Sequence, residues 1–343
     1  MTSGGFDEPG VTMRGRNMSV GDEGLVGMHD LLLGLAGRVP DEFLATARQH
    51  LADGAIDQVA ESMCQELATG GVALTFRQMS VLTEFLADTA TPTLSRIPVG
   101  DEQRVLAWHF TGAPIDSADA DDAGVAALVA VLSDAPGAQG LWRAWRGPIG
   151  GQGSWLPVYV VEAGSADPAG LTGRLQRALA AAGPDAPRVE VVAPGGEVPM
   201  YQRAARSYGR LMWAATEPAQ LNLARAFDGV DEAGDPVFEE DHPRLLDAAE
   251  RDRVLDYLRA GTVILDTDST MDDVVDRSRG SVVPVSFRSD GVWIWPDIVC
   301  YYLEQHGLAP DEQLLAHIRN ANRPPAPLGA VTTHRVLEYL SNG

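Results

Sequence analysis

The fold of the C-terminal part depends on one stretch of the chain, Phe287-Arg288-Ser289-Asp290-Gly291-Val292-Trp293-Ile294-Trp295-Pro296. The dipeptide Asp290-Gly291 favours a type I′ turn, so the flanking residues are predicted to form a β-hairpin with a two-residue loop. That turn sets a register in which the opposed pairs are Ser289/Val292, Arg288/Trp293, Phe287/Ile294 and Ser286/Trp295.

The two faces of this hairpin are predicted to differ in chemistry. Cross-strand partners share a face, so Phe287 and Ile294 form an apolar face with Val285, and the two tryptophans stand on the other with Arg288 and Ser286. Indole rings beside an arginine are typical of a recognition surface, and coverage of both rings by a helix is the alternative. The predicted partner-binding residues are Arg288, Asp290, Trp293, Trp295 and Tyr301.

Two helices are predicted after the hairpin. The first starts at Pro296 and Asp297 and ends at Gly307. The positions of this helix that are predicted to face the core follow helical spacing, and they are Val299, Tyr302, Leu303 and His306. Tyr301 lies outside this face. The second starts near Asp311, and Pro324-Pro325 then breaks the chain. Before the hairpin, Pro284 indicates that its own strand lies at a sheet edge.

This block resembles the C-terminal segments of uncharacterised actinobacterial proteins. The resemblance rests on Asp290-Gly291, Trp293-Ile294-Trp295, Tyr301-Tyr302-Leu303 and His306-Gly307, and the lysine-free, alanine- and arginine-rich composition resembles the same source. Some such proteins are linked to polymorphic toxin systems, so the resemblance implies a role as an immunity or accessory partner. It covers the C-terminal block only and implies no catalytic activity.

The rest of the chain divides into segments of different pattern. Residues 1–22 are predicted to be a disordered leader, 23–95 a helical bundle, 101–225 a mixed α/β domain, 226–250 an acidic loop, and 251–343 a hairpin-helix block packed on the middle domain. Together they predict an α+β fold (mixed α/β), in which an N-terminal bundle is followed by a layered α/β region and a C-terminal hairpin with helices.

Local signals place the elements of the first two domains. In the bundle, breaks at Pro40, Gly54 and Gly70-Gly71, with Asp41 and Thr75 at cap positions, predict four short helices. In the mixed domain, the predicted strands are 104–110, 155–161 and 188–192, and the predicted helices are 124–132, 168–182 and 199–215. This alternating order favours at least one parallel crossover.

Composition excludes several classes of function. The net charge is −22, and all 26 basic residues are arginine. Without lysine the chain has neither a Schiff-base lysine nor a Walker A lysine. The negative charge opposes binding to nucleic acid and to anionic membranes, and it favours a basic protein partner. We expect a cytoplasmic location, because there is no apolar signal segment and only Cys64 and Cys300 are available for a disulfide.

The segment from Asp228 to Glu250 carries nine carboxylates against the single Arg244. Their spacing lacks the order of a calcium-binding loop, so a solvated surface loop is the preferred interpretation over a cation site. Elsewhere, Arg203, Arg206 and Arg210 recur at helical spacing. They form either an anion-binding stripe or a set of intramolecular ion pairs.

One motif suggests an enzyme. Residues Thr262 to Thr270 resemble the opening motif of haloacid-dehalogenase-like phosphatases, which implies Asp266 as nucleophile and Asp268 as acid/base. That chemistry also needs a cation for the phosphoryl group and further carboxylates for magnesium. The chain has no lysine, and the residues after Thr270 do not show the repeated β-α units of that fold.

The preferred hypothesis is a non-catalytic cytoplasmic protein-binding module, an immunity-type inhibitor or assembly adaptor, with no cofactor and no bound metal. A metal-dependent phosphohydrolase that uses Asp266 and Asp268 is one alternative, and a structural subunit of a larger particle is another.

Overall fold

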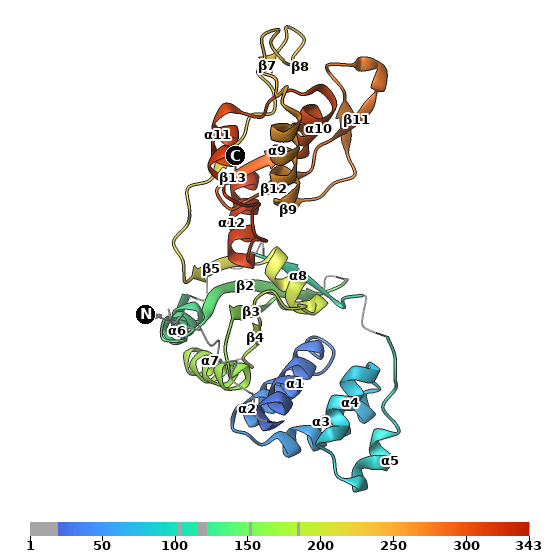
Figure 1. Cartoon of the computed structure of the whole chain (residues 1–343). Coiled ribbons are helices and arrows are strands. Elements are labelled where there is room, and N and C mark those ends of the chain that lie inside the picture. Colours follow the sequence, from blue (N-terminus) through green and yellow to red (C-terminus); the bar gives the residue numbers. More distant parts are fainter. Residues whose placement is uncertain (1–19, 102–104, 115–121, 151–152, 184–185, 343) are drawn as a thin grey trace, which may run out of the picture. The chain divides into compact units, whose positions relative to one another are not determined.

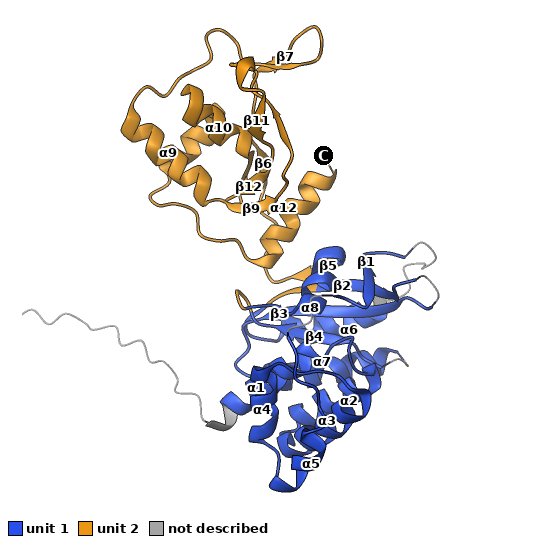
Figure 2. Ribbon diagram, turned by 90° about the vertical axis from the view of Figure 1, so that its right-hand side faces the viewer, with its two compact units in different colours: residues 1–138, 142–193, 197–210 blue, residues 139–141, 194–196, 211–343 orange. Residues whose placement is uncertain are grey.

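The computed structural model describes residues 20–101, 105–114, 122–150, 153–183 and 186–342. The predicted leader lies outside this range up to residue 19, and residues 20–22 belong to the first helix. The fold is α+β, as predicted. It forms two compact units, unit 1 with residues 1–138, 142–193 and 197–210, and unit 2 with residues 139–141, 194–196 and 211–343 (Figure 2).

Unit 1 begins with the predicted helices. They are α1 (Val20–Gly34), α2 (Asp41–Ala52), α3 (Ile56–Gly70) and α4 (Phe76–Glu84), followed by the short η1 (Asp88–Ala90) and α5 (Thr91–Leu94), and Figure 1 shows them grouped on one side of the sheet of this unit. Thr75 caps α4 with a capping box that includes Gln78. Asp41, predicted as a cap, is instead the first residue of α2 after Pro40, and its carboxylate binds Arg146 of the sheet and Arg188 just before β4.

A five-stranded sheet follows in the chain. Its strands are β1 (Trp108–Thr111), β2 (Ala138–Pro148), β3 (Leu156–Ala163), β4 (Val189–Val192) and β5 (Arg210–Ala214), in the order β1-β2-β3-β4 with β5 also paired to β2. The pairing of β3 with β4 is parallel, which confirms the predicted crossover. β2 was not predicted, because its sequence contains Gly140, Gly147 and two arginines and shows no regular alternation.

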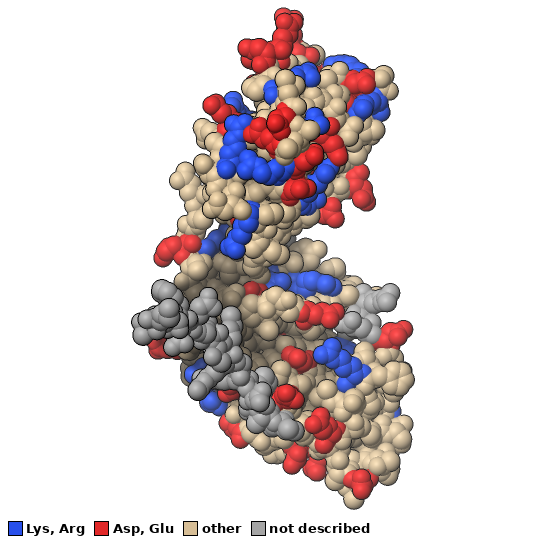
Figure 3. Space-filling model, in the orientation of Figure 1, with Lys and Arg blue, Asp and Glu red and all other residues tan. Residues whose placement is uncertain are grey.

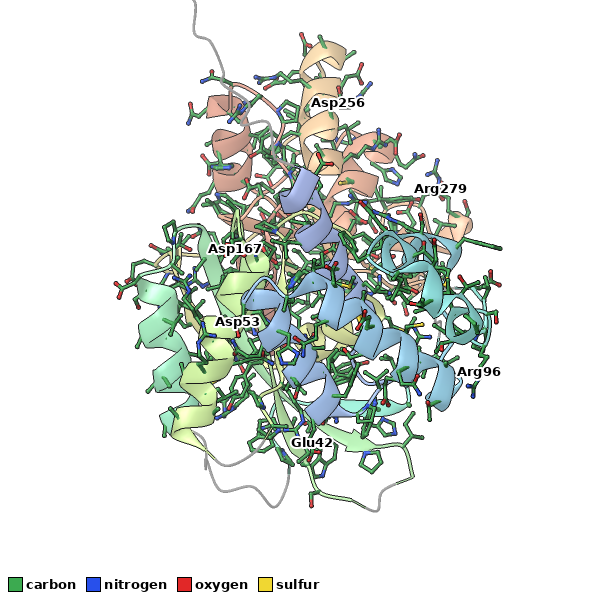
Figure 4. The ribbon with its side chains drawn as sticks, turned by 90° about the horizontal axis from the view of Figure 1, so that it is seen from below. Glu42, Asp53, Arg96, Asp167, Asp256 and Arg279 are labelled. Carbon is green, nitrogen blue, oxygen red and sulfur yellow. The ribbon has the colours of Figure 1, made fainter. Side chains whose placement is uncertain are left out.

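Three helices accompany this sheet: α6 (Asp122–Ser133), α7 (Pro168–Ala182) and α8 (Met200–Tyr208). The predicted helix 168–182 is confirmed, and Asp167, labelled in Figure 4, caps it by accepting a hydrogen bond of 2.8 Å from the Gly170 amide. The predicted helix 199–215 is wrong beyond Tyr208. Gly209 is a poor helix former, and the next residues pair with β2 as β5.

Gly37 shows how tightly the loop before α2 packs in unit 1. Its φ is +74°, and a Cβ at this position would lie 2.7 Å from the Tyr201 ring. The Gly37 carbonyl also accepts a hydrogen bond of 2.9 Å from Trp108 Nε1. Only glycine satisfies both the backbone conformation and the packing here.

Replacing Gly37 separates the cost of the positive φ from the cost of the packing clash with Tyr201. We expect Gly37→Ala to lower the free energy of unfolding by about 2 kcal/mol, because it adds a packing clash to a strained φ. Gly54→Ala is the matched control, since Gly54 has a φ of +81° with nothing within 4 Å of its Cβ position. It should cost about 1 kcal/mol. Urea denaturation measures both variants, and equal losses would contradict the packing contribution.

Unit 2 is built on a second sheet. It contains β6 (Asn222–Leu223), β9 (Thr262–Leu265), β12 (Phe287–Ser289) and β13 (Trp293–Pro296), in the order β6-β13-β12-β9. β12 runs antiparallel to both β13 and β9, and β13 runs parallel to β6. The predicted hairpin is therefore present at the centre of this sheet.

The register of the hairpin differs from the predicted one. Arg288 lies opposite Trp295 and Ser289 opposite Ile294, a shift of two residues on the second strand. The Asp290 amide bonds the Trp293 carbonyl, so Gly291 and Val292 form the loop in place of Asp290-Gly291. Gly291 has a φ of +92°, which suits the first central position of a type II′ turn. A shift of two preserves the faces, so the predicted sidedness holds.

Helices cover both faces of this sheet. They are α9 (Ala248–Ala260), α10 (Asp297–His306), α11 (Glu312–Asn320) and α12 (Ala330–Asn342). Ile264 and Ile294 pack with Val336 of α12 on one face, and the tryptophans pack with α9, α10 and α11 on the other. Figure 2 shows α12 and the pair α9 and α10 on opposite sides of the strands.

Two small ribbons complete unit 2. One pairs β7 (Gly229–Val230) with β8 (Pro236–Val237), and the other pairs β10 (Thr270–Asp272) with β11 (Ser281–Pro284), with η2 (Arg277–Arg279) between them. Pro284 thus lies in an edge strand, as predicted. Among the helices in the described ranges, none combines the length and apolarity needed to cross a membrane.

Candidate functional site

The predicted tryptophan surface is covered. Trp293 is 8% exposed and Trp295 is 0% exposed, so the alternative in which helices cover both indoles is the one found. Trp295 Nε1 donates a hydrogen bond of 3.2 Å to the Leu258 carbonyl in α9. Gly261 lies directly against the Trp295 ring, with no room for a Cβ. Trp293 and Trp295 are therefore part of the core and present no face to a partner.

The other predicted partner-binding residues also bind within the chain. Arg288 Nε donates to Asp297 at 2.7 Å, and Asp290 accepts hydrogen bonds of 2.7 Å from both Tyr257 and His317. Tyr301 lies in a separate cluster, where its hydroxyl donates to Asp273 at 2.9 Å. The predicted set is therefore a group of anchors in the fold and does not form one exposed surface.

The predicted arginine stripe does not form on one helix. Arg203 and Arg206 lie on α8, whereas Arg210 opens β5. Arg206 pairs with the buried Glu162 at 2.7 Å and lies 5.8 Å from the centroid of the Trp142 ring. The intramolecular interpretation thus applies to Arg206.

The aspartates of the phosphatase-like motif are exposed at a sheet edge. Asp266 and Asp268 follow β9, which pairs only with β12 in the described part of the sheet, and antiparallel to it. No group of three or more histidine, cysteine or acidic side chains in the described ranges is arranged to hold a metal. Cys300 is not a poised nucleophile either, because burial raises its pKa to about 12.

The strongest candidate site is a cavity of about 450 Å³ within unit 2, inside the size range of ligand pockets. Its apolar wall is formed by three aromatic rings in mutual contact, with centroids 4.8 to 5.8 Å apart, namely Phe227, Phe238 and Tyr302. Leu245, Val299, Leu308 and Leu315 extend this wall. The cavity therefore offers an apolar floor for a side chain or a small molecule.

Charged residues also line the cavity, and several are held by other groups of the chain. Arg225 lies 3.2 Å from Asp311, Arg319 lies 2.8 Å from Glu250, and Arg244 donates to the His306 carbonyl at 3.1 Å. Asp311 also caps α11 through the amides of Gln313 and Leu314. Asp311 and Glu250 thereby offset the charges of Arg225 and Arg319, whereas Arg244 is held by a neutral carbonyl.

His242 joins the acidic segment to the loop before α11. Its Nδ1 lies 2.8 Å from Asp228 and its Nε2 lies 3.0 Å from the Ala309 carbonyl. Both partners offer acceptor oxygens to the ring nitrogens. Burial raises the pKa of Asp228, but hydrogen bonds from the Glu239 amide and His242 outweigh it and hold that pKa below the ordinary value. His242 thus links Asp228 to the loop before α11 through both ring nitrogens.

Sequence patterns alone did not locate this site. Phe227, Asp228, Phe238 and His242 come from the segment predicted to be a solvated acidic loop. The usable signal was the presence of two phenylalanines and a histidine among the carboxylates, since a solvated acidic loop has no need of them. Of the remaining lining residues, Arg225 and Ala226 follow β6, and Pro243, Arg244 and Leu245 precede α9. The others come from α10, α11 and the loop between them.

Comparison with known protein families, with curated protein sequences and with solved structures finds no match to this chain. The geometry of unit 2 is therefore the basis for a functional proposal.

Proposed function

We propose that this chain is a non-catalytic cytoplasmic protein-binding module, acting as an immunity-type inhibitor or an assembly adaptor, and that unit 2 binds a basic protein partner. The cavity beside the acidic segment carries this proposal. The described residues that line it include no serine, threonine, cysteine or lysine, and the histidine among them is engaged at both nitrogens. These features favour binding over catalysis.

The charge around the cavity supports a basic partner. Carboxylates of the β7–β8 segment are exposed, among them Glu232, Glu239 and Glu240, and Figure 3 shows red side chains at the tip of unit 2 that carries these strands. A basic surface would meet these groups while an apolar side chain enters the cavity. Such charge pairing accelerates association and weakens with salt. The two cysteines are free and buried, which fits a reducing compartment.

Affinity capture from the native cell tests this proposal when it compares matched variants. The test variant is Glu232→Gln/Glu239→Gln/Glu240→Gln, and the control is Asp57→Asn/Glu61→Gln/Glu84→Gln, which removes the same charge from exposed positions of unit 1. We expect the wild type and the control to retain one basic protein that the test variant loses, with retention falling as salt rises. Equal retention by all three proteins, or a retained partner that is acidic, would contradict the proposal.

A further inference from the structure

The size of the cavity in unit 2 limits what can enter it. Its volume is about 450 Å³. A single benzene ring fills an apolar protein cavity of about 150 Å³. One such ring, or one branched aliphatic side chain of similar size, would therefore leave most of the space to water. A fused two-ring group that enters with part of its backbone uses more of the cavity.

The aromatic wall of the cavity favours a further aromatic ring. Phe227, Phe238 and Tyr302 pack against one another at interplanar angles of 54° to 71°. Phe227 and Phe238 are only partly buried, so both rings have surface left for another contact. Aromatic rings in tilted or edge-to-face contact attract one another beyond the effect of area burial. An aliphatic group of the same size gains the area burial alone.

The charges of the lining favour an uncharged group inside the cavity. Among the described lining residues, three arginines stand against three carboxylates, namely Arg225, Arg244 and Arg319 against Asp228, Asp311 and Glu312. Their formal charges cancel. Asp311 is already engaged by Arg225 and by two backbone amides. A charged group that entered would give up its hydration and gain no net opposite charge in exchange.

Two of these arginines can contact the face of an inserted ring. The side chains of Arg225 and Arg319 are 76% and 49% exposed, and each forms an ion pair with a carboxylate. A guanidinium group that is paired along its edge can still stack its flat face on an aromatic ring. Unit 1 contains this arrangement, since Arg146 is paired with Asp41 and lies 4.1 Å from the centroid of the Trp108 ring.

We propose that this cavity binds a tryptophan side chain of the basic partner, with the indole ring against Phe227 and Phe238. The basic neighbours of that tryptophan then meet the exposed carboxylates of the β7–β8 segment. This inference rests on the proposed function and adds to it the chemistry of the inserted residue. An indole suits the volume, the aromatic wall and the balanced charge together, and tryptophan is enriched among the residues that dominate binding at protein interfaces.

Three peptides of equal charge test the inserted residue. Each is Arg-Arg-Xaa-Arg-Arg blocked at both ends, with tryptophan, leucine or alanine at the central position. We expect the tryptophan peptide to bind the full chain at least about tenfold more tightly than the alanine peptide, and more tightly than the leucine peptide. Isothermal titration calorimetry measures the three dissociation constants. An affinity of the tryptophan peptide that is no higher than that of either other peptide would overturn the proposal.

That negative result is separate from failure of the proposed function. The peptides differ only in the central residue, whereas the capture variant Glu232→Gln/Glu239→Gln/Glu240→Gln changes only charge. Equal and salt-sensitive binding of all three peptides would remove the tryptophan and leave the basic partner. Loss of the charge dependence in the capture experiment would instead remove the basic partner.

A cavity-filling variant tests where the tryptophan binds. Ala226 lines the cavity and is partly buried, so Ala226→Trp should fill the space and reduce the affinity for the tryptophan peptide to that for the alanine peptide. Ala326→Trp is the control, because Ala326 is an exposed residue of the same unit outside the lining. Nuclear Overhauser contacts from the peptide indole to the Phe238 ring of the wild type give a measurement that needs no variant. A preference for tryptophan that persists in Ala226→Trp, or indole contacts elsewhere on the chain, would also overturn the proposal.

Discussion

Arg48→Met is expected to lower the free energy of unfolding of unit 1 by about 3 to 5 kcal/mol, because it leaves the carboxylate of Glu190 buried without its cation. Both side chains are 2% exposed, and Glu190 would retain only the hydrogen bond of 2.7 Å from Gln202. Urea denaturation of the full chain, with hydrogen exchange of the α2 and β4 amides to identify unit 1, measures the loss.

Two further variants show whether burial causes this loss. In Arg48→Met/Glu190→Leu both charges are gone, and we expect most of the stability to return. Arg177→Met breaks an ion pair of 3.6 Å with Asp53, whose side chains are 54% and 60% exposed, and should cost less than about 1 kcal/mol. If Arg48→Met were no more destabilising than Arg177→Met, the Arg48–Glu190 pair would not be buried as described.

The same pair shows which parts of unit 1 the sequence could predict. Helix α7 was predicted within its bounds, because Asp167 and Pro168 mark its start by local chemistry alone. Strand β2 was missed, since its buried Arg143 and Arg146 look like surface residues in sequence. Arg146 is stabilised inside by Asp41 and Tyr201, more than fifty residues away in either direction. Local patterns carry no information about such partners.

In unit 2 the sequence predicted the alternation of the hairpin but not its surroundings. Period-two alternation predicts that Trp293 and Trp295 lie on one face of the sheet, and both pack in the same core cluster. What covers the face depends on α9, α10 and α11, whose positions follow from tertiary packing. The turn lies one residue later than predicted, because the Asp290 carboxylate accepts hydrogen bonds from the amides of Val292 and Trp293. The cavity was missed for the same reason, since segments distant in the sequence form it.

Asp290→Ala is expected to destabilise unit 2 by about 3 kcal/mol. One carboxylate oxygen accepts the amides of Val292 and Trp293, and the other accepts Tyr257 and His317 at 2.7 Å. Its side chain is 4% exposed, so the variant leaves several buried donors without an acceptor, each at a cost of about 1 kcal/mol or more. Urea denaturation measures the loss, and hydrogen exchange of the β12 and β13 amides assigns it to this hairpin.

The control and the pH dependence follow from the same contacts. Asp268→Ala removes an exposed aspartate of the same unit and should change stability by less than about 0.5 kcal/mol. Burial raises the pKa of Asp290, but hydrogen bonds from the Trp293 amide, Tyr257, the Val292 amide and His317 outweigh it and lower that pKa below the ordinary value. The ionised carboxylate is therefore favoured in the folded state, so its contribution is fully present above about pH 4 and is lost as pH falls through the lowered pKa. The difference in stability between wild type and Asp290→Ala should shrink over that acidic range, and a constant difference would contradict the role of the charge.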